Sequence, residues 1–193
     1  VPLNSKRPPP QTGILGNSLM AETQPGELPV IDKRAFRDTL GRMPTGVTII
    51  TTCDSTGERA GATVGSFTSL SLDPPLVLFS LDKTANCYPN FLSCTHFSVN
   101  ILAEDQTEYS NIFASKSDRP WDELPLRTGA PNTPPLLEGC VGYIECAHEA
   151  THPGGDHDIF VGRVLRLWNE GLDRRPMLFF GGAYRRLDTD IVS

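Results

Sequence analysis

The chain has 193 residues, of which 38% are apolar and 21% charged, and these values suit one soluble globular domain with a hydrophobic core. No apolar run approaches the ~20 residues that cross a bilayer, and the chain does not start with the basic-then-apolar pattern of a secretory signal. The expected location is therefore the cytoplasm, without a membrane. The formal net charge of −6 gives no general attraction for nucleic acid, which is not expected as a partner.

The five cysteines are expected to be reduced thiols at small buried positions. Their number is odd and no C-x-x-C pair occurs, so neither a disulfide framework nor a zinc ribbon is indicated.

Residues 1–30 are expected to form a flexible arm outside the core. They hold six of the 17 prolines and show no apolar periodicity. Met20 is a candidate natural start, in which case the preceding residues come from a cloning vector. The predicted domain then covers residues 31–193.

The first predicted helix begins near Asp32, which is a good N-cap, and ends at Pro44. Its apolar residues Phe36, Leu40 and Met43 recur on one face. Extended segments follow. The β-branched run 47–52 predicts a strand, a turn covers 54–57, and residues 61–71 form another extended stretch before Asp73-Pro74-Pro75.

The remaining elements are also mostly strands. Residues 76–81 are apolar almost throughout, as in a strand covered on both faces, whereas 97–101 alternate between a dry and a polar face. A second helix is expected to start near Glu104 or Asp105. Further strands are predicted at 141–148, 157–168 and 177–180. Six or seven strands with few helices predict a mainly β barrel or sandwich, with no Rossmann or P-loop motif.

The most informative candidate segment is Thr63-Val64-Gly65-Ser66-Phe67-Thr68-Ser69-Leu70-Ser71. Hydroxyls crowd this stretch, and Gly65 lets a ligand approach the backbone closely. Backbone amides and hydroxyls of this kind bind the polar edge of an isoalloxazine ring. A solvent-exposed Thr/Ser-rich strand without a ligand is the alternative reading.

A second candidate follows the apolar strand, at Ser80-Leu81-Asp82-Lys83-Thr84-Ala85-Asn86. Hydroxyls, an ammonium and free amides at the start of a helix suit a phosphate. Plain N-capping by Thr84 or Asn86, with Lys83 in solvent, is equally compatible with the pattern.

The third candidate is His157, in Gly154-Gly155-Asp156-His157-Asp158, where a ring at the mouth of a strand suits a nicotinamide carboxamide or a phosphate. An ordinary turn histidine is the alternative. Cys146, His148 and His152 with His157 also suggest soft metal ligands, but they lack the paired spacing of structural zinc sites, so no metal is expected. A serine hydrolase is disfavoured because no G-x-S-x-G elbow occurs.

Five segments in order resemble the short-chain flavin reductase family, the reductase components of two-component flavin monooxygenases. Pro44 to Thr52 resembles its first barrel strand, and Thr63 to Pro75 its T-x-x-S-F-x-S-x-S-x-x-P-P segment. Phe97 to Gln106 resembles the F-x-V-N-I-L strand with its helix. Gly155 to Val164 is similar to G-D-H-x-I-x-x-G-x-V, and Pro176 to Leu187 to the closing G-x-Y segment. The resemblance covers about Phe36 to Leu187.

The resemblance implies a Greek-key split β-barrel with a few flanking helices, forming a homodimer that binds flavin. It implies an NAD(P)H:flavin oxidoreductase that passes a hydride from nicotinamide C4 to flavin N5 and supplies reduced flavin to a separate monooxygenase. FAD or FMN and NADH or NADPH both stay open. The cofactor-binding positions carried over are Thr45, Thr63, Val64, Gly65, Ser66, Phe67, Thr68, Ser69, Ser80, Lys83, Thr84, Asn100, Leu102, Ala103, Phe113, His157, Tyr184 and Arg185.

Within that set, Ser80, Lys83 and Thr84 are implied to hold phosphate, and His157, Tyr184 and Arg185 to lie near the nicotinamide cofactor. No acid–base residue is expected, because hydride transfer requires positioning above all. The chain departs from the family at Gly65, where asparagine is common, and at Arg119-Pro120-Trp121, where Arg-Phe is common. Two alternatives stay open. One is a non-catalytic flavin-binding split barrel. The other is a pyridoxamine-phosphate-oxidase-like enzyme, whose phosphate pocket is expected to carry more arginines.

Overall fold

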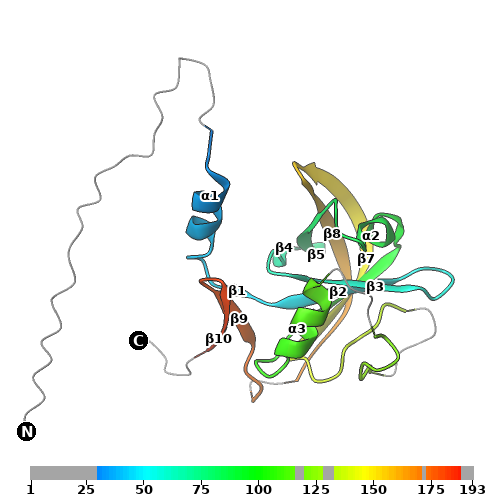
Figure 1. Cartoon of the computed structure of the whole chain (residues 1–193). Coiled ribbons are helices and arrows are strands. Elements are labelled where there is room, and N and C mark those ends of the chain that lie inside the picture. Colours follow the sequence, from blue (N-terminus) through cyan, green and yellow to red (C-terminus); the bar gives the residue numbers. More distant parts are fainter. Residues whose placement is uncertain (1–29, 116–119, 128–132, 171–172, 188–193) are drawn as a thin grey trace, which may run out of the picture. The chain divides into compact units, whose positions relative to one another are not determined.

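Antiparallel strands are the main regular elements of the computed structural model, which describes residues 30–115, 120–127, 133–170 and 173–187 (Figure 1). The chain divides into two compact units, residues 1–37 and 38–193. The predicted arm, residues 1–30, lies almost wholly outside the described residues. No helix in the described part of the chain has the length and apolar character that spanning a membrane requires.

Helix α1 (Lys33–Leu40) begins where the sequence predicts. The Asp32 carboxylate caps it by accepting a hydrogen bond of 2.8 Å from the Ala35 amide. The apolar face of Phe36, Leu40 and Met43 is exposed, and α1 buries none of its residues.

The remaining elements include the predicted strands and the second predicted helix, in the predicted order. They also include two strands, Thr45–Gly46 and Ala183–Arg186, and a helix, Tyr88–Ser93, that were not predicted as separate elements. They are β1 (Thr45–Gly46), β2 (Thr48–Cys53), β3 (Arg59–Val64), β4 (Thr68–Leu72), β5 (Pro75–Asp82), α2 (Tyr88–Ser93), β6 (His96–Ile101), α3 (Thr107–Ala114), β7 (Gly142–Gly154), β8 (His157–Asn169), β9 (Met177–Phe180) and β10 (Ala183–Arg186).

Seven strands form one antiparallel sheet in the order β3-β2-β6-β7-β8-β5-β4, and β1, β9 and β10 form a small second sheet. The predicted mainly β, antiparallel class is therefore confirmed. The large sheet does not close on itself, because β3 and β4 are its two edges. These edge strands are neighbours in the chain, so residues 65–67 carry it from one edge of the sheet to the other.

The extended stretch predicted at residues 61–71 is thus two strands rather than one. The break falls at Gly65, where a Cβ atom would lie only 3.0 Å from Oγ1 of Thr45. A glycine inside a strand-like segment marks such a close approach of backbone to a neighbour.

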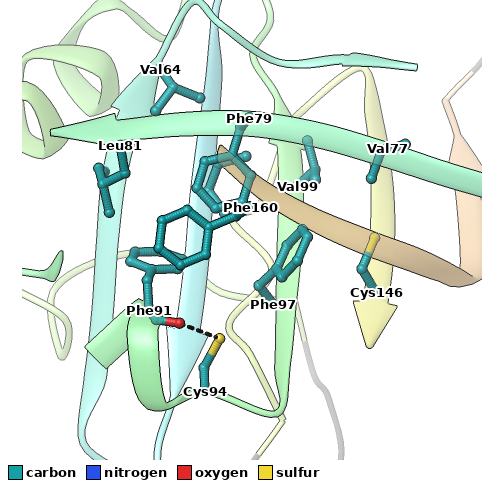
Figure 2. Packing of buried hydrophobic residues seen from close by; sticks show 12 residues of the cluster. Val64, Val77, Phe79, Leu81, Phe91, Cys94, Phe97, Val99, Cys146 and Phe160 are labelled. Carbon is teal, nitrogen blue, oxygen red and sulfur yellow. Dashed lines mark hydrogen bonds between the residues drawn. The ribbon is translucent and has the colours of Figure 1, made fainter. Parts of the chain in front are cut away.

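Aromatic side chains fill the main core, which Figure 2 shows from close by. The Phe79 and Phe160 rings stack with centroids 5.2 Å apart, and Phe97 meets Phe79 edge-on at 5.2 Å. Gly162 lies against this cluster, since a Cβ atom there would fall 2.2 Å from Cζ of Phe97. The glycine of the G-D-H-x-I-x-x-G-x-V segment therefore makes room for a core ring.

Strand β5 is buried on alternate residues only. Val77, Phe79 and Leu81 enter the core, whereas the residues between them are half-buried. The expectation of a strand covered on both faces is wrong for this single chain.

The polar face predicted for residues 97–101 exists, but it is buried. Ser98 and Asn100 have no exposed surface, because residues 134–137 cover them. The Asn100 carboxamide accepts a hydrogen bond of 2.8 Å from the Leu137 amide and donates one of 3.1 Å to the Ile49 carbonyl. Buried polar groups are stable only when they are paired in this way.

Candidate active site

A cavity of about 460 Å³ lies at the open edge of the large sheet, between β3, β5 and the end of α3. Separate parts of the chain contribute its walls: β3 and the residues after it, β5 and its following turn, α3, and the start of β8. The lining residues are Ala62, Thr63, Val64, Gly65, Ser66, Ser80, Leu81, Asp82, Thr84, Ala85, Asn86, Cys87, Phe113, Ala114, Ser115 and His157.

Ser66 ties the linker between β3 and β4 to strand β5. Its hydroxyl donates to the Ser80 carbonyl at 3.1 Å and accepts from the Ser80 amide at 3.0 Å. The two serines predicted in separate candidate segments therefore form one wall of the cavity.

A second cavity of about 270 Å³ shares Thr63, Val64, Gly65 and Ala114 with the first. Its other lining residues are Thr45, Val47, Ser110, Phe179 and Tyr184. The two cavities are therefore neighbours, separated only by the end of β3 and Gly65.

Hydrogen bonds to α3 hold the polar side chains of the second cavity. The Tyr184 hydroxyl lies 2.9 Å from the Ser110 hydroxyl and 3.0 Å from Oδ1 of Asn111. On the side shared by the two cavities, the Thr63 hydroxyl donates to the Ser110 carbonyl at 2.8 Å. Phe179 packs edge-on against Tyr184, with ring centroids 5.6 Å apart.

Lys83 is turned toward β8 and does not line the cavity. Its ammonium donates to the Gly155 carbonyl at 2.9 Å and pairs with Oδ1 of Asp158 at 3.1 Å. The Asp158 side chain is only 11% exposed, and its other oxygen accepts a hydrogen bond of 2.5 Å from the Tyr88 hydroxyl. The Tyr88 hydrogen bond, and after it the Lys83 ammonium, hold the pKa of the Asp158 carboxyl below its ordinary value.

His157 lies at the rim of the cavity with its side chain 41% exposed. Its Nδ1 is 2.8 Å from Oδ1 of Asp156, and this contact lowers the pKa of the Asp156 carboxyl. With Nδ1 engaged, Nε2 is the ring nitrogen left to meet a bound molecule.

The structure thus gathers ten of the predicted positions around the two cavities: Thr45, Thr63, Val64, Gly65, Ser66, Ser80, Thr84, Phe113, His157 and Tyr184. It does not place the other eight on their walls.

Four of these eight lie near the edge strands or at the end of the small sheet. Phe67 packs against the main core, Thr68 and Ser69 are exposed on β4, and Arg185 is exposed on β10.

The other four have their own partners. Asn100 forms the buried network under residues 134–137, Leu102 is buried in the second core cluster, and the Ala103 amide donates to the Gln106 carboxamide oxygen at 2.9 Å. Lys83 is held by Asp158.

Several lining residues were not predicted. Ala114 and Ser115 come directly after the predicted Phe113, and this position at the end of the helix is the signal by which they could have been found. For Cys87, the sequence predicted only a reduced thiol at a buried position. Trp121 belongs to the loop that departs from the family, yet its ring packs edge-on against Phe113, with centroids 5.1 Å apart.

The donors present fit a flavin. The volume of the larger cavity lies within the roughly 300–1,000 Å³ of ligand pockets. Strand β3 is an edge of the described sheet, so one row of its backbone amides and carbonyls has no strand partner and faces outward. These amides and carbonyls are the neutral donors and acceptors that an isoalloxazine edge requires. The hydroxyl protons of Thr63 and Ser66 are already donated to Ser110 and Ser80. Among the described residues on the wall there is one carboxylate, Asp82, and neither lysine nor arginine.

An open antiparallel sheet with a hydroxyl-lined cavity at its edge defines a cofactor-binding split barrel. The sequence profile of the flavin reductase like domain matches residues 40–188. The chain therefore belongs to the flavin reductase family, and the resemblance found in its motifs is confirmed.

Individual relatives agree with this assignment. The chain is 40% identical to the FMN reductase (NADH) SmoA of Agrobacterium fabrum, over 80% of its own length and 86% of the relative. It is 37% identical to the reductase component of the flavin-dependent trigonelline monooxygenase of Acinetobacter baylyi, covering 86% of this chain but only 54% of that protein. The structure of the NADH:FAD oxidoreductase SgcE6 of Streptomyces globisporus, in complex with NAD and FAD fragments, matches with a TM-score of 0.76 and 36% identity, over 83% of this chain and 98% of SgcE6.

Proposed function

We propose that this protein transfers a hydride from a reduced nicotinamide cofactor to a flavin bound in the larger cavity. The observation that carries the proposal is the meeting of Thr63, Ser66, Ser80, Thr84 and His157, from separate predicted segments, around one cavity of suitable size. The SmoA and SgcE6 relatives, named for NADH and flavins, support NADH as the donor and a flavin as the acceptor.

The chain's residues bind and orient in this reaction. The edge of β3 offers backbone amides as neutral donors to the polar rim of the flavin ring, which stabilise the negative charge of its reduced form. The hydroxyls of Thr63 and Ser66 hold this part of the wall in place through their hydrogen bonds to Ser110 and Ser80. His157, at the rim, is assigned to orienting the nicotinamide cofactor, and Tyr184 lines the neighbouring cavity. The flavin itself supplies the redox chemistry.

Reduced flavin is then passed to a separate flavin-dependent monooxygenase. The relative of Acinetobacter baylyi, which is the reductase component of such a system, supports this role. A wall with no lysine or arginine among its described residues also suits a flavin that must leave again.

The protein is further proposed to be a cytoplasmic homodimer. Leu165, Leu167 and Trp168 on β8 and Leu72 on β4 are exposed in the single chain, with Leu72 at 93%. Exposed apolar residues on these strands suit contact with a second copy of the chain. All five cysteines lie in the described part of the chain and none forms a disulfide, which is typical of a reducing compartment.

The test is absorbance at 340 nm with NADH or NADPH and added FMN or FAD. Rapid oxidation that depends on flavin supports the reductase, and comparing the four pairs defines both preferences. Flavin binding without oxidation of either nicotinamide would instead support a non-catalytic flavin-binding barrel. His157→Ala is expected to raise KM for the nicotinamide more than it lowers kcat, and the reverse pattern would contradict an orienting role.

A further inference from the structure

We propose that Asp158 limits how tightly the protein holds the phosphate of its flavin, by keeping the Lys83 ammonium in an ion pair beside the cavity. This inference rests on the proposed function, since it concerns the affinity of the same site. Its consequence is that the bound flavin is released readily.

Lys83 is a candidate cation for a phosphate, because it lies between two residues of the cavity wall. Both of its neighbours in the chain, Asp82 and Thr84, line the cavity. The Thr84 amide and hydroxyl both donate to Oδ1 of Asp82, at 2.7 and 2.8 Å. The described wall otherwise offers a phosphate only its remaining hydroxyls and amides and the ring of His157. A monoester phosphate carries about −1.5 to −2 charges at neutral pH, so an added cation there would strengthen binding considerably.

The Asp158 carboxylate neutralises the positive charge of the Lys83 ammonium. Its Oδ1 lies 3.1 Å from the Lys83 ammonium, and the Gly155 carbonyl accepts a second hydrogen bond from the same ammonium at 2.9 Å. The Tyr88 hydroxyl, 2.5 Å from the other carboxylate oxygen, fixes the carboxylate in this orientation. Because the pair is neutral as a whole, it contributes little net attraction at the end of the cavity that Thr84 lines.

The carboxylate is well placed to act on the cavity, because Asp158 directly follows the rim residue His157 in β8. It also pairs across the ladder with Leu81, which is itself a lining residue. A change of charge at Asp158 therefore falls beside residues that line the cavity, and salt screens charges less strongly when they lie closer together than about 8–10 Å.

The test compares FMN with riboflavin, which has the same ring and no phosphate, by quenching of flavin fluorescence in the full-length protein. Asp158→Asn removes the negative charge and keeps the shape of the side chain. We expect it to tighten FMN binding by about threefold to tenfold, while riboflavin binding changes by less than about twofold. The gain should shrink as salt rises, because screening weakens the attraction between Lys83 and the phosphate.

A second set of variants distinguishes a Lys83 ammonium that Asp158 neutralises from one that already binds the phosphate. Lys83→Met leaves Asp158 as an unpaired negative charge and should weaken FMN binding. The double variant Lys83→Met/Asp158→Asn should return FMN affinity close to that of the wild type. If the double variant stays as weak as Lys83→Met, Lys83 binds the phosphate directly and Asp158 does not limit it.

Two further variants control for structure. Glu149→Gln breaks the pair with Arg163, at 2.6 Å on the same β7–β8 hairpin, and should leave the ratio of FMN to riboflavin affinity unchanged. Tyr88→Phe keeps the charge of Asp158 and should not tighten FMN. Unchanged or weaker FMN binding in a folded Asp158→Asn protein, or equal tightening of riboflavin, overturns the inference. Failure of the wild type to bind any flavin would instead overturn the proposed function.

Discussion

The hydroxyl of Ser66 forms two reciprocal hydrogen bonds with the backbone of Ser80, accepting from its amide at 3.0 Å and donating to its carbonyl at 3.1 Å. One side chain thereby satisfies two backbone groups of β5 at the wall of the larger cavity. The contact positions the linker after β3 and, with it, the backbone that faces a bound flavin.

Replacing Ser66 with alanine is expected to weaken flavin binding several-fold and to lower stability by about 1 kcal/mol, because the Ser80 amide and carbonyl lose their partner but stay accessible to water. Fluorescence quenching and chemical denaturation measure the two effects. Thr68→Ala is the matched control, since its hydroxyl makes only a long contact of 3.4 Å and lies off the cavity wall. Equal effects of the two variants would contradict the role given to Ser66.

Cys87 provides a footprint of the cavity that does not depend on turnover. It lines the cavity and is half-exposed, whereas Cys53 is half-exposed and does not line it. Saturating FMN is expected to slow alkylation of Cys87 by iodoacetamide while leaving Cys53 unaffected, as read by peptide mass spectrometry. Protection of both thiols, or of neither, would contradict the location of the site.

The buried thiols of Cys140 and Cys146 should resist alkylation, unlike those of Cys87 and Cys53. Burial raises the pKa of Cys140 and of Cys146 to about 12. Almost no thiolate is therefore present at pH 8, and neither residue should react until the protein unfolds.

Asn100 is expected to act on stability rather than on flavin affinity. Asn100→Leu would leave the Leu137 amide without its acceptor in a fully buried place, at a cost of about 1–3 kcal/mol. Denaturant titration should show this loss, whereas the folded variant should bind FMN as the wild type does. A large loss of flavin affinity in the folded variant would show that Asn100 contributes to the cofactor site.

Gly162→Ala tests the packing of the core. The added methyl group would meet Cζ of Phe97 and Cβ of Cys146, at 2.2 and 2.9 Å, and forcing them apart should cost about 1–3 kcal/mol. Gly46→Ala serves as the control, because nothing lies within 4 Å of its Cβ position. Comparable denaturation midpoints for both variants would show that the core yields more easily than its geometry indicates.

The ion pair of Asp158 predicts a pH dependence of stability. The folded-state pKa of this carboxyl lies below its unfolded value of about 3.9, so its stabilising effect is present above that pH and is lost as the pH falls through the folded-state pKa. Asp158→Asn should therefore lower Tm at pH 7 and differ less from the wild type near pH 3. A difference in Tm that does not change with pH would contradict the sign of this shift.

Much of the fold was predictable because local patterns and tertiary packing agree. The β-branched run 47–52 forms β2 (Thr48–Cys53), and the alternation at 97–101 forms β6 (His96–Ile101). The predicted cap at Asp32 is also present. Burial was harder to predict, because it depends on partners distant in sequence. Ser98 and Asn100 have a typical solvent-facing pattern, yet residues 134–137 cover them.

Prediction of the site also succeeded where local motifs decide the position of a residue and failed where distant partners do. Thr63, Ser66, Ser80 and His157 lie around the cavity as the motifs indicated. Lys83 differs, because a carboxylate 75 residues further along the chain, Asp158, turns it aside. The local sequence around Lys83 and Thr84 contains no signal for this distant partner. Ser115 was missed although it lies close to the predicted Phe113. Cys87 was missed because its place on the wall depends on how the chain folds before α2.

The chain crosses from one edge of the open sheet to the other within residues 65–67. This linker acts as a covalent strap of fixed length, so the mouth of the cavity cannot widen by moving β3 and β4 apart. Gly65 and Ser66 of this linker also line the larger cavity. A substitution that lengthened the linker would therefore change the cavity wall and the path between the two sheet edges at the same time.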